Sequence, residues 1–102
     1  MIKKLTTEEF GEEIKKPTIV KFYTEGCAPC KMIAQRYIDI AEKNSQYSFC
    51  ELDANEEYAV TEAYSVLSVP TFILFKGGQE IMRMDHMKLA EAHIKEAFSG
   101  VL

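Results

Sequence analysis

Cys27 and Cys30 are the residues of this chain whose type and spacing point most directly to chemistry. A cysteine three positions after another can lie one helical turn beyond it, and the two sulfurs can then close a disulfide without movement of the backbone. A dithiol that opens and closes in this way works as a reversible redox switch. The pair therefore predicts thiol–disulfide chemistry.

The sequence around the pair predicts that it lies where a strand meets a helix. Residues 18–24 are mostly β-branched and aromatic, which is typical of a largely buried strand. Beyond Cys30, apolar residues recur at helical spacing, namely Met32, Ile33, Tyr37, Ile38 and Ala41. Cys27 then begins the helix, where free backbone N–H groups and the positive end of the helix dipole stabilise a thiolate. We expect Cys27 to act as the nucleophile and Cys30 as the resolving thiol.

The N-terminal half of the chain predicts parallel strands with helices between them. Thr6 and Glu9 have the spacing of a helix capping box, and residues 2–5 suit a short edge strand. The helix that follows the cysteines should end near Asn44, and residues 47–52 have the pattern of a second central strand. Parallel strands need right-handed crossovers, which place helices on both faces of the sheet.

Two further helices are expected in the C-terminal half. Asp53 and Asn55 are the expected caps of a short helix, whose apolar residues are Ala59, Val60, Ala63 and Tyr64. A last helix is expected over residues 88–98, with Gly100 just past its end. Its apolar side should consist of Leu89, Ala92, Ile94 and Phe98.

A hairpin is expected between these two helices. The strand-like residues 71–76 and 79–84 flank Gly77 and Gly78, a glycine pair that signals a tight turn. Together the elements predict an α/β domain.

The composition is that of one globular domain without a nucleic-acid footprint. The 102 residues are 47% hydrophobic, so we expect a single domain over residues 1–102. The formal charge of −4 and the lack of a basic face argue against nucleic-acid binding, and no apolar run reaches membrane length. Three cysteines are too few for a secreted disulfide framework, so we expect a cytoplasmic protein.

The chain resembles the thioredoxin family in the order and spacing of three motifs. They are GCAPCK at residues 26–31 after a strand, SVPTF at 68–72 and FKGG at 75–78. The resemblance implies the thioredoxin fold, a central mixed β-sheet with helices on both faces. It also implies an enzyme that reduces disulfides of client proteins through a Cys27/Cys30 cycle, with no cofactor or metal beyond that disulfide. A thioredoxin reductase or another dithiol would supply the electrons, and we expect a monomer.

Pro70 is the second position to which the resemblance assigns a role. Proteins similar to thioredoxin hold this proline in cis beside the cysteine pair, where it also keeps metal ions from the thiols. A cis bond would turn the backbone of Val69 outward, so that its N–H and C=O could pair with an extended substrate segment. A trans proline that starts a strand is the alternative.

Three positions beside the cysteines are expected to contact substrate, and two departures from the family pattern fall among them. Gly26 stands where thioredoxins usually carry tryptophan, so contact area for substrate is lost there. Ala28 and Pro29 replace the usual Gly-Pro pair between the cysteines, and this dipeptide tunes the redox potential in such proteins. The direction of the change does not follow from the sequence.

A third departure concerns two charges. The buried acid that thioredoxins carry before the cysteine motif aligns with Lys21, and their partner lysine aligns with Glu51. An isolated buried lysine would be costly, which favours a pair between the two side chains. We expect Glu51, paired with Lys21 beneath the cysteine helix, to move the proton of Cys30. The alternative is that both charges lie at the solvent ends of the sheet.

Two other classes of function remain open. A structural zinc site could use Cys27, Cys30 and Cys50 with His86 or His93, although Cys50 should point away from the pair as a small core residue. A binding or scaffold protein with inactive cysteines is the second. His86 could narrow the docking site or be simply exposed, and His93 is expected on the surface.

Overall fold

Five strands form one sheet and four helices cover it within residues 2–99, which the computed structural model describes. The strands are β1 (Lys3–Lys4), β2 (Thr18–Tyr23), β3 (Ser48–Asp53), β4 (Thr71–Lys76) and β5 (Gln79–Asp85). The helices are α1 (Thr7–Glu13), α2 (Ala28–Lys43), α3 (Tyr58–Ala63) and α4 (Glu91–Phe98). The strand order is β1-β3-β2-β4-β5.

The mixed sheet brings two segments that are distant in the sequence to the same end of its inner strands β2 and β4. β1, β3 and β2 pair in parallel, whereas β4 runs antiparallel to both β2 and β5. Because β2 and β4 run in opposite directions, the end of β2 lies beside the start of β4, where Phe22 pairs with Thr71. The loop that leaves β2 and the loop that enters β4 therefore meet at this end of the sheet.

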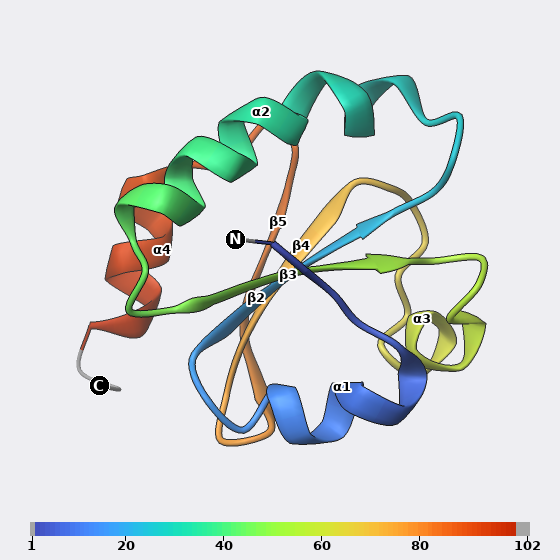
Figure 1. Ribbon diagram of the computed structural model, residues 1–102, viewed down its shortest axis with the longest axis horizontal. Helices are drawn as coiled ribbons and strands as arrows, with labels where there is room; N and C mark the ends of the chain where they lie inside the picture. The colour runs from blue at the N-terminus through green and yellow to red at the C-terminus, as the bar shows by residue number, and fades with distance from the viewer. Residues whose placement is uncertain (1, 100–102) are drawn as a thin grey trace.

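Helices cover both faces of the sheet, as expected (Figure 1). Side chains of α2 and α4 share one core with alternate strand residues, and this core includes Ile19, Tyr37, Phe49, Ile94 and Phe98. Side chains of α1 and α3 share the other core, which includes Phe10, Val20, Cys50, Val60 and Phe75. Alternation along β2 and β3 explains the division, because successive strand residues point to opposite faces.

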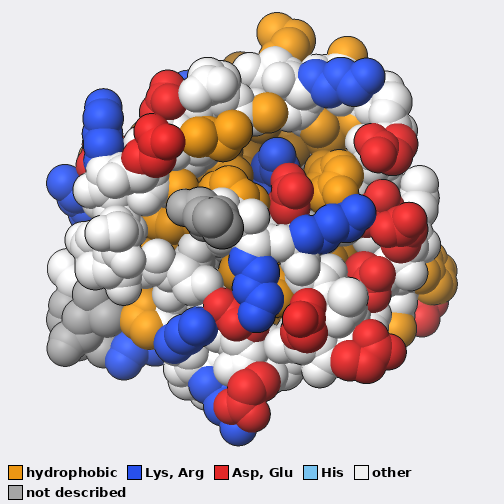
Figure 2. All heavy atoms as spheres, viewed as in Figure 1, with side chains coloured by type: hydrophobic (Ala, Val, Ile, Leu, Met, Phe, Trp, Pro, Cys, Tyr) orange, Lys and Arg blue, Asp and Glu red, His pale blue; other side chains and the backbone are white. Residues whose placement is uncertain are grey.

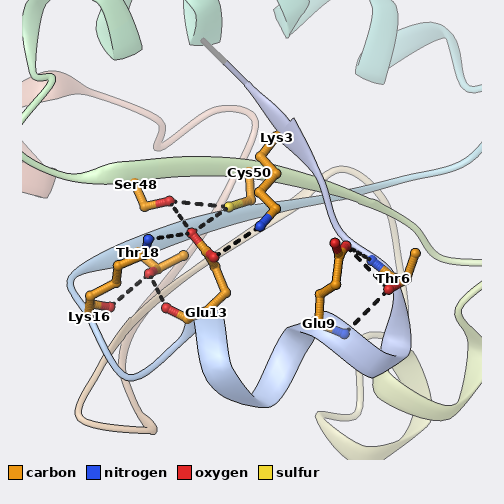
Figure 3. Close-up of polar contacts among 8 residues, drawn as sticks. All are labelled: Lys3, Thr6, Glu9, Glu13, Lys16, Thr18, Ser48 and Cys50. Carbon is orange, nitrogen blue, oxygen red and sulfur yellow. Dashed lines mark hydrogen bonds and ion pairs between the residues drawn. The ribbon is translucent and has the colours of Figure 1, made fainter.

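The start of α1 confirms the predicted capping box. The Thr6 hydroxyl accepts the backbone N–H of Glu9 at 3.3 Å, and the Glu9 carboxylate accepts the backbone N–H of Thr6 at 3.1 Å (Figure 3). These reciprocal bonds satisfy two backbone donors at the helix end. The expected edge strand before the box is also present as β1.

The predicted caps of the short helix are wrong. Asp53 closes β3, and its Oδ1 accepts the backbone N–H groups of Asn55 at 2.9 Å and Glu56 at 3.1 Å. The carboxylate thus stabilises the turn that leaves the strand. The helix α3 begins later, with Glu57 as a cap whose side chain forms no capping hydrogen bond.

Two apolar faces are narrower than predicted. Met32 is 84% exposed and Ile38 is 37% exposed, so neither belongs to the buried side of α2. One position along a helix rotates a side chain by about 100°, which takes Met32 off the face that its neighbour buries. Helix α4 begins at Glu91 instead of residue 88, and Ala92 is exposed. The expected cap Gly100 lies outside the described residues.

The hairpin and the surface follow the sequence pattern. Gly77 and Gly78 have φ angles of +62° and +81°, which glycine adopts without a steric penalty.

Basic and acidic side chains are interspersed over the face shown in Figure 2, and they form no continuous basic stripe there. Within residues 2–99, no helix combines the length and apolar character that a membrane span requires.

Candidate active site

Cys27 is the N-cap of α2, as the sequence predicts. Its Sγ accepts the backbone N–H of Cys30 at 3.2 Å, so the sulfur receives one of the free donors of the helix end. Pro29 lies in the first turn, where a missing N–H costs little. Gly26 precedes the cap with a φ of +80°, a conformation that favours glycine. The chain can therefore turn sharply from β2 into the helix.

The two cysteines are joined in a disulfide, with their Cα atoms 5.3 Å apart. Cys30 is 5% exposed, whereas Cys27 is half-buried. The outer sulfur therefore belongs to the cysteine at the helix end. This asymmetry fits an outer nucleophile and an inner resolving thiol.

The Val69–Pro70 peptide bond is cis and lies beside the disulfide. The Cys27 Sγ is 3.8 Å from the carbonyl oxygen of Val69. Pro70 is buried, while Val69 is half-buried. In the part of the chain that the structure describes, no hydrogen bond uses the Val69 backbone N–H. The cis bond expected for Pro70 is present, and the trans alternative is excluded.

Lys21 and Glu51 form the expected ion pair, with Lys21 Nζ 3.6 Å from Glu51 Oε2. They are direct neighbours on β2 and β3. The Lys21 side chain is 8% exposed and that of Glu51 is 31% exposed, so the pair does not lie at the solvent ends of the sheet. Both line a cavity of about 230 Å³ to which Cys30 also contributes. The structure thus places the pair beneath the first turn of α2.

The residues of the alternative zinc site do not come together. Cys50 is fully buried on the α1 and α3 side of the sheet, away from the face that α2 covers. His86 and His93 are exposed, and His93 Nδ1 lies 2.8 Å from the backbone oxygen of Lys88. Among residues 2–99, no three His, Cys, Asp or Glu side chains are arranged to hold a metal ion. The structure gives no support to the zinc alternative.

A second cavity is lined by Val69, whose carbonyl oxygen contacts Cys27, and it was not anticipated from the sequence. It has a volume of about 250 Å³ and lies between α3 and the loop that carries Val69. Two of its lining residues are unusually accessible, since Leu67 is 94% exposed and Tyr58 is 62% exposed. The one available signal was an apolar leucine in a segment that belongs to no predicted element.

The geometry of the disulfide indicates a class of protein. A closed disulfide between an outer cysteine at a helix end and a buried cysteine has the arrangement of the oxidised half of a dithiol couple, as in thiol–disulfide oxidoreductases. The family model for thioredoxin matches residues 1–98. The chain belongs to the thioredoxin family.

Individual relatives agree with this assignment. The chain is 41% identical to Thioredoxin-2 of Saccharomyces cerevisiae over 85 residues, which are 83% of this chain and 80% of that protein. It is 44% identical to thioredoxin-like protein R548 of Acanthamoeba polyphaga mimivirus over 75 residues, which are 72% of this chain. That alignment spans only 55% of the length of the viral relative.

Solved structures show the same fold. Mitochondrial thioredoxin 3 of Saccharomyces cerevisiae, in its oxidised form, superposes with a TM-score of 0.84 at 31% sequence identity. The superposition covers 93% of this chain and 94% of that chain. The expected thioredoxin fold is confirmed.

Proposed function

We propose that this protein reduces disulfides of client proteins through its own dithiol. The observation that carries the proposal is the Cys27–Cys30 disulfide, with its outer sulfur at the start of α2 and next to Val69. The reaction needs no cofactor beyond this disulfide, because both electrons come from the two cysteines.

The cycle follows from the position of each sulfur. In the reduced protein, the Cys27 thiolate attacks one sulfur of the client disulfide, and the other client sulfur leaves as a thiolate that takes up a proton. Cys30 then loses its proton and attacks Cys27 Sγ, which releases the second client sulfur and closes the Cys27–Cys30 bond. The client gains two electrons and the protein loses two.

The client segment is proposed to bind at the end of the sheet where the loop after β2 meets the loop before β4. The Val69 backbone offers its N–H and C=O for a short strand addition, with Pro70 beside it, while Gly26, Ala28 and Pro29 border the outer sulfur.

Leu67 is proposed to extend this client surface, because it is almost fully exposed beside Val69. A Leu67→Asp substitution should raise the KM for a protein client several-fold and leave the kcat nearly unchanged. The same substitution should not affect reduction of a small disulfide such as oxidised glutathione. An equal loss with both substrates would argue against a client-binding role.

The partners and setting are further parts of the proposal. Membership of the family favours a thioredoxin reductase, or another dithiol donor, as the source of electrons. A reducing compartment such as the cytoplasm is favoured because Cys50 is an unpaired thiol. A monomer is favoured because Cys27, Cys30 and Val69 of one chain make up the reacting centre. Cell fractionation and light scattering test the last two statements.

The activity is tested by reduction of insulin with dithiothreitol, followed by turbidity. We expect the wild-type protein to accelerate precipitation and Cys27→Ser to abolish the acceleration. Cys50→Ala is the matched control, because it removes a thiol that faces the other core and should retain the activity. Cys30→Ser should trap clients as mixed disulfides on Cys27. If Cys27→Ser were as active as wild type, the proposal would be wrong.

A further inference from the structure

Lys21 is the one basic residue that is buried among residues 2–99. It lies on β2, between β3 and β4, and its Nζ is 5.5 Å from the ring centroid of Tyr37 and 5.6 Å from that of Tyr23. The partner carboxylate of Glu51 is nearly four times more exposed, at 31% against 8%. Within this ion pair, the positive side chain is therefore better shielded from solvent than the negative one.

The Lys21 side chain lies beneath the side of α2 that carries Cys30. Cys30, Ala34 and Tyr37 follow one another at helical spacing, and Cys30 and Tyr37 are buried. Lys21 lies under Tyr37 and lines the cavity that Cys30 and Ala34 also line. The inner sulfur of the dithiol thus shares a cavity with this positive charge.

The other ionisable groups at this cavity are closer to solvent. Glu25 on the loop before α2 and Lys31 on α2 are exposed, while Glu51 on β3 and the Tyr23 phenol on β2 are partly exposed. Water and salt screen exposed charges strongly, but they screen a buried charge much less. Lys21 is therefore the least exposed charged side chain that lines this cavity.

We propose that Lys21 stabilises the Cys30 thiolate and thereby makes the Cys27–Cys30 disulfide easier to reduce by a low-molecular-weight monothiol. This inference rests on the proposed dithiol chemistry. It concerns the step that regenerates the dithiol. Lys21 would act in this step through Cys30, without contact to the substrate.

The regenerating reaction has two steps. A monothiol thiolate attacks Cys27 Sγ, the Cys27–Cys30 bond breaks, and its electron pair leaves with Cys30 as a thiolate. A second monothiol thiolate attacks the sulfur of the bound monothiol, releasing the Cys27 thiolate and a small disulfide. The protein gains two electrons and two monothiols are oxidised. Lys21 acts in the first step, because a stabilised thiolate is a better leaving group.

The test is the equilibrium of the full-length protein with reduced and oxidised glutathione, measured by acid quench, alkylation and mass spectrometry. Lys21→Met keeps the aliphatic stem and removes the charge, so the equilibrium should shift toward the disulfide by about tenfold at pH 9. The shift should be smaller at pH 6, because the charge acts on the thiolate and not on the thiol. A loss of packing alone would have no such dependence on pH.

Two further variants keep the inference testable if Lys21→Met folds poorly. Glu51→Gln removes the counter-charge, so it should move the equilibrium in the opposite direction, toward the dithiol. Lys31→Met removes an exposed charge next to Cys30 and should change the equilibrium less than about twofold.

The outcomes separate this inference from the proposed function. Equal equilibria for wild type, Lys21→Met and Glu51→Gln would overturn the role of Lys21, even if all three proteins reduced insulin. An effect of Lys31→Met as large as that of Lys21→Met would overturn it as well. Failure of the wild-type protein to reduce insulin would instead contradict the proposed function.

Discussion

At the scale of single residues, the environment makes three cysteines chemically different. Cys27 receives a backbone N–H at a helix end, and Cys30 is shielded beneath it. Cys50 is fully buried on the opposite face, and this burial raises the pKa of its thiol to about 11. A hydrogen bond with Ser48 acts in the other direction but does not outweigh the burial. Residue type alone therefore does not identify the reactive sulfur.

The reactivity of Cys50 should be very low in the folded protein. After reduction at pH 8, iodoacetamide should label Cys27 quickly and leave Cys50 unlabelled, because Cys50 remains a protonated and inaccessible thiol. The raised pKa also means that Cys50 favours the folded state below the pKa of an unfolded thiol and loses this contribution as pH rises toward 11. Mass spectrometry of labelled peptides checks the prediction. Labelling of Cys50 as fast as Cys27 would contradict it.

The proton transfer expected of Glu51 can be tested by a single substitution. Glu51→Gln cannot accept the proton of Cys30, so the rate of disulfide reduction should fall by about tenfold or more, and its pH profile should change shape. Stopped-flow reduction of a client disulfide across the pH range measures this effect. Glu25→Gln is the control, because Glu25 is an exposed acid at the same cavity. An unchanged profile for Glu51→Gln would exclude the role.

At the scale of elements, the end of α1 is fastened to the sheet by the carboxylate of Glu13. The side chain is 9% exposed, and it accepts a hydrogen bond from Ser48 on β3 at 2.6 Å (Figure 3). Lys3 on β1 and Lys16 lie at 3.3 Å and 3.2 Å from its oxygens. One buried carboxylate therefore joins a helix and two strands.

Loss of the Glu13 charge should destabilise the protein at neutral pH. Burial alone would raise the pKa of Glu13, but the bonds from Ser48, Lys16 and Lys3 outweigh it, and the pKa is lowered. Glu13→Gln should reduce the free energy of unfolding by about 1–2 kcal/mol at pH 7. Because the folded pKa is the lower one, this difference should shrink as the pH falls below the ordinary glutamate pKa of about 4.3.

Urea unfolding at several pH values measures the effect of Glu13. Glu12→Gln is the matched control, because Glu12 is the adjacent acid and its side chain is 81% exposed. The control should change the free energy of unfolding by less than about 0.5 kcal/mol. A difference at pH 7 that persisted unchanged at pH 3 would show that the charge of Glu13 is not responsible.

At the scale of the whole molecule, two separate cores hold the sheet from opposite sides. Helix α4 closes the core that α2 begins, and the Phe98 ring lies 4.6 Å from the ring centroid of Tyr47. The active-site helix therefore depends on a core that the last helix completes. The two faces of the sheet are stabilised by different helices, although successive residues of the same strands contribute to one face and then the other.

Removal of Phe98 should have a global effect. Phe98→Ala should lower the free energy of unfolding by about 3–5 kcal/mol, because loss of the fully buried ring leaves a cavity between α4 and Tyr47, which precedes β3. Met87→Ala is the control, since Met87 is 81% exposed and its loss should cost less than about 0.5 kcal/mol. Urea unfolding followed by circular dichroism measures both variants. Equal stabilities would contradict the proposed importance of this core.

Much of the candidate site could be predicted from the sequence because its determinants are local. The spacing of Cys27 and Cys30, the strand before them and the helix after them are short-range patterns, and the structure confirms each. The Thr6 capping box and the glycine hairpin are local in the same sense. The caps at Asp53 failed because a carboxylate near a strand end can serve a turn as well as a helix.

Properties that depend on long-range packing were decided by the tertiary structure. The strand register places Lys21 against Glu51, and only the folded chain shows that the lysine is the better shielded of the two. The same packing exposes Leu67, whereas the burial of Cys50 on the far face follows the predicted alternation along the strand. Sequence periodicity identifies an apolar face within one element, but the burial of a charge depends on which elements pack around it. The chemistry of this protein was therefore readable from local spacing, and the electrostatic setting of its inner sulfur was not.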